Sequence, residues 1–359
     1  MGGIRSFEES DIERVVALRE QCFGASSQHS ADDKAAYFRD IFFHSPWADP
    51  QCPSLVFEDR KGELTGFLGA LVRPIVFQGQ TLSMAVATQL MSAPDRPGMS
   101  GLKLMKAFLD GPQALSMADS TAPGARIIWQ RLGGHVAELY SLNWLRPLRP
   151  HLHARGEFGA PGAAKLLSRA LAPINALQDR LLAANPQSRF YQQPTTLNAS
   201  ELGTDGFVSV MSALQDKLAL SPHYTSESAS WLMPRLEPQD SGATLRAQQL
   251  TDPEGQAVGW YLYIANPGAT GQVLQVGADG SNAEAVLQHL NHDAWQQGCL
   301  AVSGRVQPEL LPLLAKAPGM LRDNGPCTAV HARDPELLNT VLRGEAWLTR
   351  LEGEWWLRF

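Results

Sequence analysis

Hydrophobic positions along the first 150 residues alternate between the spacing of half-buried strands and that of amphipathic helices. Three apolar runs lie close together and are separated only by Arg60-Lys-Gly62 and Gln78-Gly79, which favour tight turns, so these runs predict hairpin-linked strands. The predicted elements, in chain order, are a strand at 4–7, helices at 10–24 and 30–45, strands at 54–58, 64–77 and 81–91, a helix at 98–109, a strand at 114–118, a helix at 125–132 and two strand-like runs within 136–148. This order is typical of an α/β fold with a mixed sheet and flanking helices.

The second half of the chain repeats this order of elements with little sequence identity. Its predicted elements are helices within 207–220 and 228–236, strands at 244–250, 257–265 and 271–277, a helix at 282–297, a strand at 300–306, a helix at 309–317, and strand-like runs at 327–331 and 346–359 around a helix at 335–343. Two copies of one α/β plan account for this order better than one large sheet does. We therefore predict two domains of the same fold in tandem, at 1–150 and 206–359.

Residues 151–205 differ in composition from both halves and predict a helical linker. Leucines and alanines recur at helical spacing over Lys165–Ala184, and Pro173 is expected to break that helix. The leucines are too many for a free tether, so we expect the linker to pack against the rest of the protein.

The composition agrees with a globular protein of two domains. The chain has 359 residues, more than the ~250–300 at which a single core stops growing, and 44% of them are hydrophobic. A net charge of -6 leaves no broad basic surface for nucleic acid, and no charge-free apolar run is long enough to span a membrane. The start of the chain lacks the apolar core of a signal peptide, and the four cysteines form no CxxC pair. We therefore expect a cytoplasmic protein without a structural zinc site or a disulfide framework.

Candidate chemistry lies where the last of the hairpin-linked strands leads into a helix. The apolar strand from Thr81 is followed by a loop of small residues that includes Gly98, Ser100 and Gly101. Such residues let a backbone approach a ligand closely, and the free N–H groups of a first helical turn favour an anion. An ordinary strand-to-helix turn would have the same composition, because glycine and proline are common there. The segment alone leaves both readings open.

The same segment resembles the pyrophosphate-binding motif of the GNAT acyl-CoA-dependent acyltransferases, in which a strand ends in Q/R-x-x-G-x-G/A before a helix. Gly98 and Ser100 match the fourth and sixth positions of that motif. Asp95 stands at the first position, where it would add negative charge near a diphosphate, and Arg96 is displaced by one.

A second resemblance begins at Ala122, where the sequence is similar to the family's later helix, N-x-x-A-x-x-x-Y-x-x-x-G-F. Ala125, Trp129 and Gly133 keep the register of that pattern. Ala122 and Trp129 replace its asparagine and its tyrosine. The resemblance covers residues 4–148 and rests on the order of elements together with several weak motifs.

The whole chain resembles tandem GNAT proteins, including ones encoded with bacterial exopolysaccharide genes. Trp231-Leu-Met-Pro-Arg235 is loosely similar to a Leu-x-Trp-Arg helix of that subgroup, and Trp347-Leu-Thr349 with Leu351-Glu-Gly-Glu354 is similar to its ending. In the second half, Asp279 follows the corresponding strand and would repel a phosphate. The second domain is therefore expected to be degenerate, and the acyl-CoA site to lie in the first.

The resemblance implies transfer of an acyl group from acetyl-CoA, or another acyl-CoA, to an amine. In the family, the strand before the loop splays away from its neighbour, so that its backbone N–H groups hold the thioester carbonyl as an oxyanion hole does. The implied acyl-CoA contacts fall on Leu90, Met91, Arg96, Gly98, Met99, Ser100, Gly101 and Trp129.

The resemblance also suggests residues for proton transfer. A tyrosine usually protonates the leaving thiolate, and Trp129 cannot, so Tyr140 is the candidate if the fold brings it near. Asp119 and Ser120 are expected to face the acceptor, although Asp119 would equally serve as a helix cap. In N-myristoyltransferases of this superfamily the C-terminal carboxylate is the base. The carboxylate of Phe359 is thus another candidate if the apolar end of the chain inserts as a strand, and an exposed edge strand is the alternative.

The acceptor is expected to be a small-molecule amine or sugar bound between the two domains, with the second domain shaping the cleft. Asp95 and Trp129 depart from the family pattern, so the alternative function is a catalytically silent scaffold or ligand-binding protein. A homo-oligomer is compatible with either function.

Two pairs of histidines have spacings that suit a metal ion. They are His151 with His153 and His289 with His292. The same positions suit solvated histidines, because the first pair adjoins the linker and the second lies on a polar helix face. We expect no metal site.

Overall fold

The computed structural model describes residues 2–24, 30–94, 99–157, 163–215, 217–239, 242–316, 319–323 and 326–357. The chain forms two compact units, each of which combines segments that are distant in sequence. The first unit comprises Met1–Ser141, Val208–Leu232 and Gly325–Phe359, and the second comprises Leu142–Phe207 and Met233–Asn324. The domains expected at 1–150 and 206–359 are contiguous and so differ from these units, and the residues of the expected linker fall in the second unit.

The first unit is built on an eight-stranded sheet. Seven of its strands have the order β1-β2-β3-β4-β5-β15-β6, and the eighth, β9, pairs with β3. Its strands are β1 (Gly3–Ser6), β2 (Leu55–Glu58), β3 (Leu64–Phe77), β4 (Gln80–Ser92), β5 (Leu115–Thr121), β6 (His135–Val136), β9 (Leu220–Pro222) and β15 (Cys327–Ala332). β4 and β5 are parallel, and the other paired strands are antiparallel. The hairpin-linked strands predicted from the sequence are β2, β3 and β4, so that prediction is confirmed.

The second unit has a seven-stranded sheet with the order β14-β7-β13-β12-β11-β10-β8. Its strands are β7 (Leu142–Pro147), β8 (Asn198–Glu201), β10 (Thr244–Thr251), β11 (Ala257–Ala265), β12 (Thr270–Ala278), β13 (Ala301–Arg305) and β14 (Met320–Asp323). Counted from β8, this sheet repeats the first one strand by strand, and β12 with β13 forms its parallel pair as β4 with β5 does in the first. The predicted repeat of one mixed α/β plan is thereby confirmed.

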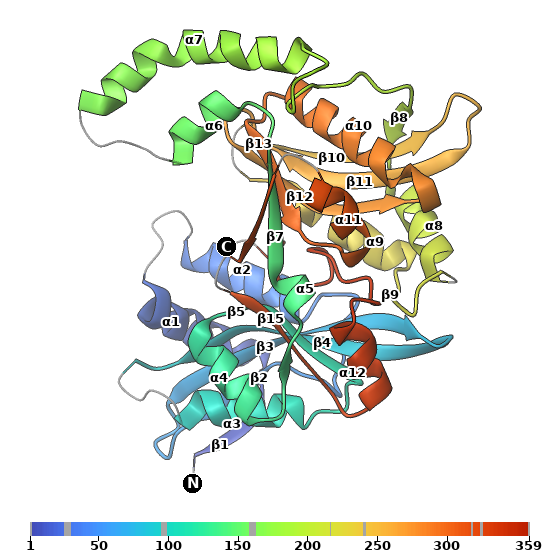
Figure 1. Ribbon diagram of the computed structural model, residues 1–359. Coiled ribbons are helices and arrows are strands. Elements are labelled where there is room, and N and C mark those ends of the chain that lie inside the picture. Colours follow the sequence, from blue (N-terminus) through green and yellow to red (C-terminus); the bar gives the residue numbers. More distant parts are fainter. Residues whose placement is uncertain are drawn as a thin grey trace. The chain divides into compact units, whose positions relative to one another are not determined.

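Each sheet takes one strand from the other half of the chain (Figure 1). β15, drawn in orange-red, lies between β5 and β6 of the first sheet, and β7, drawn in green, lies between β13 and β14 of the second. Hydrophobic patterning predicts where strands occur but not which strand each of them pairs with. The exchange therefore explains why the compact units are discontinuous.

Two hydrophobic clusters lie on opposite faces of the first sheet. The helical elements of this unit are η1 (Glu9–Asp11), α1 (Ile12–Phe23), α2 (Ala31–Phe42), α3 (Met99–Leu109), α4 (Pro123–Arg131), α5 (Glu138–Ser141), α9 (Ser226–Leu232) and α12 (Pro335–Leu342), while α8 (Thr204–Gln215) begins in the second unit. Successive residues of a strand point to opposite faces. Phe67 of β3 packs with Phe38 of α2. The next residue, Leu68, packs on the other face with Leu104 of α3.

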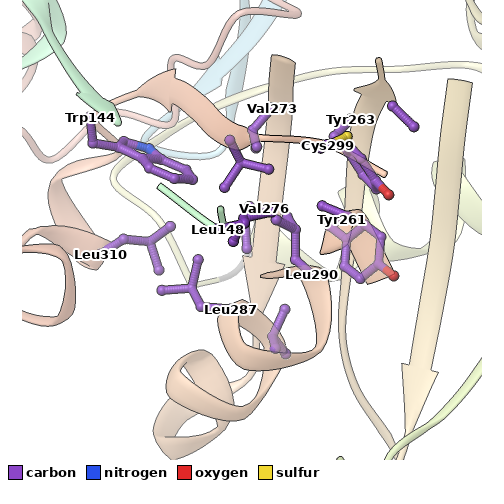
Figure 2. Packing of buried hydrophobic residues seen from close by; sticks show 14 of the residues in the cluster. Trp144, Leu148, Tyr261, Tyr263, Val273, Val276, Leu287, Leu290, Cys299 and Leu310 are labelled. Carbon is purple, nitrogen blue, oxygen red and sulfur yellow. The ribbon is translucent and has the colours of Figure 1, made fainter. Parts of the chain in front are cut away.

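The core of the second sheet is covered by α10 (Figure 2). The helical elements of this unit are α6 (Pro150–Glu157), α7 (Ala163–Ala184), η2 (Met233–Leu236), η3 (Gly280–Asn282), α10 (Ala283–Gln296), η4 (Pro308–Leu310) and α11 (Leu311–Lys316). Leu287 and Leu290 of α10 lie beside Val276 of β12 in Figure 2. Trp144 of the exchanged strand β7 joins the same cluster. The strand from the other half thus contributes to this core.

Some local predictions are wrong. α7 continues through Pro173, so this proline does not break the helix. The strand expected at 346–359 is not formed, because residues 347–357, which we call the tail, consist of turns and irregular backbone. Leu351 and Trp356 of the tail are nevertheless buried. An apolar run predicts burial without distinguishing a strand from a buried coil.

Candidate active site

β4 loses its regular pairing with β3 at one point near its end. The register shifts between Phe67 and Gly69, where two residues of β4, Gln89 and Leu90, oppose a single residue of β3. Gln89 has a φ of 50°, a left-handed conformation that residues other than glycine seldom adopt. This arrangement is a β-bulge, and bulges redirect the backbone groups that follow them.

The bulge turns the backbone of Leu90 away from β3. The N–H of Ala93 donates to the carbonyl oxygen of Thr65 at 3.0 Å, so Ala93 faces β3. Backbone groups alternate in direction along a strand, so Met91 also faces β3, whereas Leu90 and Ser92 face the opposite side. Of the amides expected to hold a thioester carbonyl, the geometry favours Leu90, and the expectation for Met91 is corrected.

The side that Leu90 faces is the side on which β4 and β5 part. In the described chain these parallel strands pair only over Met84–Val86 and Leu115–Met117. β4 continues to Ser92 and β5 continues to Thr121. The facing edges of the two strands beyond their paired residues, which we call the split, are therefore unpaired with each other. The splayed strand expected from the resemblance is present.

The tail crosses the split and contacts both of its edges. The Thr88 hydroxyl of β4 donates to the carboxylate of Glu354. The backbone N–H of Glu354 donates to Oδ1 of Asp119, on β5, at 2.8 Å. A Cβ on Gly353 would lie 1.9 Å from Oδ2 of Asp119, so only glycine fits there without a shift. Glu354 is thereby held beside the bulge.

Tyr37 of α2 lies close to Glu354 and to Gln89 of the bulge. The side-chain amide of Gln89 donates to the Tyr37 hydroxyl at 3.2 Å. Burial, and secondly the negative charge of Glu354, raise the pKa of Tyr37 above its ordinary value. The phenol therefore keeps its proton at neutral pH and is a potential hydrogen-bond donor at the split.

Two buried charged residues, Arg73 and Glu352, fix the tail through separate hydrogen bonds. Arg73 of β3 is 3% exposed, donates to the carbonyl oxygen of Leu351 at 2.8 Å, and lies 3.7 Å from the ring centroid of Trp47. Glu352, 1% exposed, accepts a hydrogen bond from the Tyr224 hydroxyl at 2.8 Å. Burial lowers the pKa of Arg73, while Tyr224 and Glu352 oppose that change. These contacts anchor the tail at Leu351 and Glu352.

The first turn of α3 packs closely against the end of β4. The hydroxyl of Ser100 donates to that of Ser92 at 3.0 Å, and Ser100 is buried. A Cβ on Gly101 would lie 3.0 Å from the Ser92 oxygen. Ser100 and Gly101 therefore bring the helix start, with the backbone of Met99, close to the strand. The Ser100 side chain, and the lack of a side chain on Gly101, serve this packing.

Asp95, Arg96 and Gly98 lie outside the described residues. The phosphate-binding role expected for Arg96 and Gly98 stays a prediction. The described first turn of α3 carries no acidic residue, which is compatible with an anion at its N–H groups.

The structure places the remaining expected site residues differently. Trp129, 1% exposed, belongs to the hydrophobic core and packs edge-on against Phe108 at 6.4 Å. The Tyr140 hydroxyl donates to the carbonyl oxygen of Ala346 at 2.5 Å and accepts from the N–H of the same residue at 3.1 Å. Ser120 is exposed beside Asp119. Trp129 and Tyr140 thus act in packing, and Tyr140 anchors the residue before the tail.

Glu354, Tyr37 and Gln89 were not recognised as site residues from the sequence. The signal for Glu354 was present, because Glu352 and Glu354 lie in a segment rich in large apolar residues, between Leu351 and Trp356. Acidic residues in a run that is otherwise buried need partners, and such residues cluster at functional sites.

The second unit contains a corresponding split that is already occupied. β12 and β13 pair only over Thr270–Val273 and Ala301–Gly304 in the described chain. Beyond this, the side-chain amide of Gln307 accepts from the N–H of Val276 at 2.9 Å and donates to its carbonyl oxygen at 2.8 Å. Gln307 is buried and satisfies the backbone that a ligand would otherwise contact. This favours the expectation of a degenerate second domain.

The histidine pairs do not form a cluster of ligands. His151 contacts Asp179 at 2.7 Å, His289 contacts the Tyr261 hydroxyl at 3.1 Å, and His292 contacts Gln296. Within the described ranges, no group of three His, Cys, Asp or Glu side chains could hold a metal ion. No helix in those ranges combines the length and apolar character needed to cross a membrane.

Comparison with protein families finds one match. Residues 3–114 match the model of an acetyltransferase (GNAT) domain. The matched region contains β1 to β4 and α3, and so includes the bulge and one edge of the split. No curated protein sequence matches the chain.

Solved structures with the same fold cover nearly the whole chain. A GCN5-related N-acetyltransferase from Anabaena variabilis has a TM-score of 0.60 at 14% identity, over 93% of this chain and 73% of its own. A probable N-acyltransferase from Enterococcus faecalis has a TM-score of 0.59 at 11% identity, over 92% and 73%. Saccharomyces cerevisiae N-myristoyltransferase with bound myristoyl-CoA and inhibitors has a TM-score of 0.50 at 10% identity, over 92% and 79%. At these identities the likeness is one of fold.

Proposed function

We propose that the chain, of which residues 3–114 match the model of an acetyltransferase (GNAT) domain, is an N-acyltransferase that transfers an acyl group from an acyl-CoA to an amine. The observation that carries the proposal is the bulge at Gln89 and Leu90, which directs a backbone N–H into the split between β4 and β5. A thioester carbonyl oxygen bound there would accept a hydrogen bond from Leu90, and that bond would strengthen as negative charge develops on the oxygen.

The CoA portion would extend from the split toward the start of α3. The N–H groups of the first helical turn are suited to a diphosphate, and Arg96 would add a positive charge. The co-substrate is proposed to be acetyl-CoA or a longer acyl-CoA. Myristoyl-CoA is bound in the yeast N-myristoyltransferase structure, which has the same fold, so both lengths are part of the test.

A catalytically silent, ligand-binding protein is the second candidate. The family's acid tyrosine is replaced by Trp129, and this residue is buried in the core. A protein of this kind would bind acyl-CoA without turning it over.

Turnover by the full chain distinguishes the two functions. Purified protein is incubated with acetyl-CoA or myristoyl-CoA and a panel of primary amines, and release of the CoA thiol is measured together with the acylated amine by mass spectrometry. Enzyme activity predicts equal amounts of thiol and acylated amine. Binding without either product would favour the silent protein, and neither binding nor product would contradict both.

A further inference from the structure

Among the described residues, three acidic side chains lie at or next to the split, and they differ in accessibility. Asp119 is 4% exposed and Glu352 is 1% exposed, so substrate from solvent does not reach either. Glu354 is partly exposed. Its carboxylate accepts from Thr88, which precedes the bulge directly. Among these acids, Glu354 is therefore the one that both reaches solvent and lies beside the position proposed for the thioester.

On the basis of the proposed function, we propose that Glu354 is the general base that takes the proton from the attacking amine. Its place results from contacts that leave the carboxylate at the split while its backbone is fixed: the N–H is bonded to Asp119, and the neighbouring Gly353 packs against the same side chain. A base must lie within hydrogen-bond reach of the proton it accepts, and a carboxylate beside the carbonyl meets this condition.

The groups that face Glu354 come from several elements. Tyr37 of α2 is a neutral phenol that carries its proton, and Arg19 of α1 lies near enough to Tyr37 to act on it electrostatically. Asp119 of β5 accepts from the Glu354 backbone, and Thr88 of β4 donates to its side chain. The hydrogen bond from Thr88 stabilises a carboxylate that must be ionised to act as a base.

The reaction then balances in protons. The amine nitrogen attacks the carbonyl carbon, a C–N bond forms, and the C–S bond of the thioester breaks. Of the two protons that an ammonium nitrogen loses, one passes to Glu354 and from there to solvent. The other passes to the sulfur, which leaves as the CoA thiol. No further reactant is required.

The same chemistry favours an amine acceptor over an alcohol. A glutamate has an ordinary pKa of about 4.3, and an alkylammonium such as lysine has one of about 10.4. Water has a pKa of about 15.7, and an alcohol is similarly reluctant to lose its proton. A lone carboxylate can deprotonate the ammonium far more readily. The acceptor is therefore assigned as a primary amine rather than a sugar hydroxyl.

Glu354→Gln tests the base directly, because a glutamine oxygen can still accept the hydrogen bond from Thr88. With acetyl-CoA and the best amine of the panel, we expect kcat to fall by about 10²–10⁴-fold, with unchanged acetyl-CoA affinity. The acidic limb of the wild-type kcat/KM profile should disappear. Glu354→Asp should retain that limb at a reduced rate. Glu345→Gln, at an exposed glutamate, is the matched control and should behave as wild type.

The outcomes separate the base from its rivals. Wild-type kcat and an unchanged pH profile in Glu354→Gln would overturn the proposal, as would equal turnover of butanol and butylamine by the wild type. A variant extended by one glycine past Phe359 tests the terminal carboxylate: loss of activity there, with Glu354→Gln active, would transfer the role to that group. If wild-type protein neither binds nor turns over any acyl-CoA, the proposed function itself fails.

Discussion

Glu354 and Asp119 are joined by a hydrogen bond of 2.8 Å from the backbone N–H of the first to Oδ1 of the second, across 235 residues of sequence. The bond links the tail to the end of β5, and the Thr88 hydroxyl links the same residue to β4. A segment close to the end of the chain thus completes the split that the first half of the chain forms. The sequence suggested that Asp119 faces the acceptor. In the structure Asp119 holds the backbone of Glu354, and we propose that Glu354 faces the acceptor.

Gly353→Ala should displace the tail. The new methyl group would lie 1.9 Å from Oδ2 of Asp119, so either the tail or the carboxylate must move. We expect a lower melting temperature together with a loss of turnover. Gly124→Ala, where no atom lies within 4 Å, is the control and should leave both unchanged. Full activity of Gly353→Ala would mean that the position of the tail is unimportant.

Gln89→Gly and Gln89→Val test the bulge. A left-handed residue other than glycine costs on the order of 1–3 kcal/mol, so Gln89→Gly should keep the bulge and its thermal stability despite losing the contact with Tyr37. A β-branched valine does not fit a φ of 50° and should distort β4 at Leu90. Thiol release should persist in the glycine variant and be lost in the valine variant. Equal activity of the two variants would show that turnover does not depend on the bulge.

Tyr140→Phe distinguishes an anchor from an acid. Removing the hydroxyl leaves the buried backbone groups of Ala346 without their partner, which should lower the free energy of unfolding by about 1–3 kcal/mol. Because Tyr140 contacts the chain just before the tail, kcat at a temperature well below the melting point should change little. A fall in kcat of a hundredfold or more, with the fold intact, would restore Tyr140 as the acid.

Alkaline pH should destabilise the second unit through Tyr263. Burial, and then the charge of Asp293, raise the pKa of Tyr263 above its ordinary value, and its hydroxyl donates to Asp293 at 2.6 Å. The neutral phenol therefore stabilises the fold below the unfolded-state pKa of about 10, and this contribution is lost as the pH rises further. Chemical denaturation at pH 8 to 11 should show the fall, and Tyr263→Phe should reduce its slope. An unchanged slope would contradict this assignment.

The sequence predicts the local elements of this protein better than their partners. The hairpins that join β2, β3 and β4 and the start of α2 after Ser30 have short-range causes, and these were predicted correctly. The exchange of β7 and β15 depends on long-range pairing, to which hydrophobic spacing is insensitive. The bulge could not be predicted either, because its left-handed residue is Gln89, whereas glycine usually marks such a position in a sequence.

The candidate site shows the same division. Leu90 and Met91 were both expected as backbone donors to a thioester; the geometry favours Leu90, and its role stays a prediction. Trp129 was assigned to acyl-CoA binding by its place in the family pattern, and Tyr140 to proton transfer by its residue type, whereas the structure uses both in packing. Glu354 was missed because its neighbours, Thr88 and Asp119, lie hundreds of residues away along the chain.

The most direct measurement is the stoichiometry and location of acyl-CoA binding, by calorimetric titration of the full chain with acetyl-CoA and with myristoyl-CoA. We expect one site per chain for at least one of them, because Gln307 occupies the second split. Binding should be lost in Gly98→Val and Ser100→Leu and be retained in Asp279→Ala. Saturating ligand, at about 100 times its Kd, should stabilise the wild-type fold by about 2.7 kcal/mol. Two sites per chain, loss of binding in Asp279→Ala alone, or no binding of either acyl-CoA would contradict a single acyl-CoA site in the first unit.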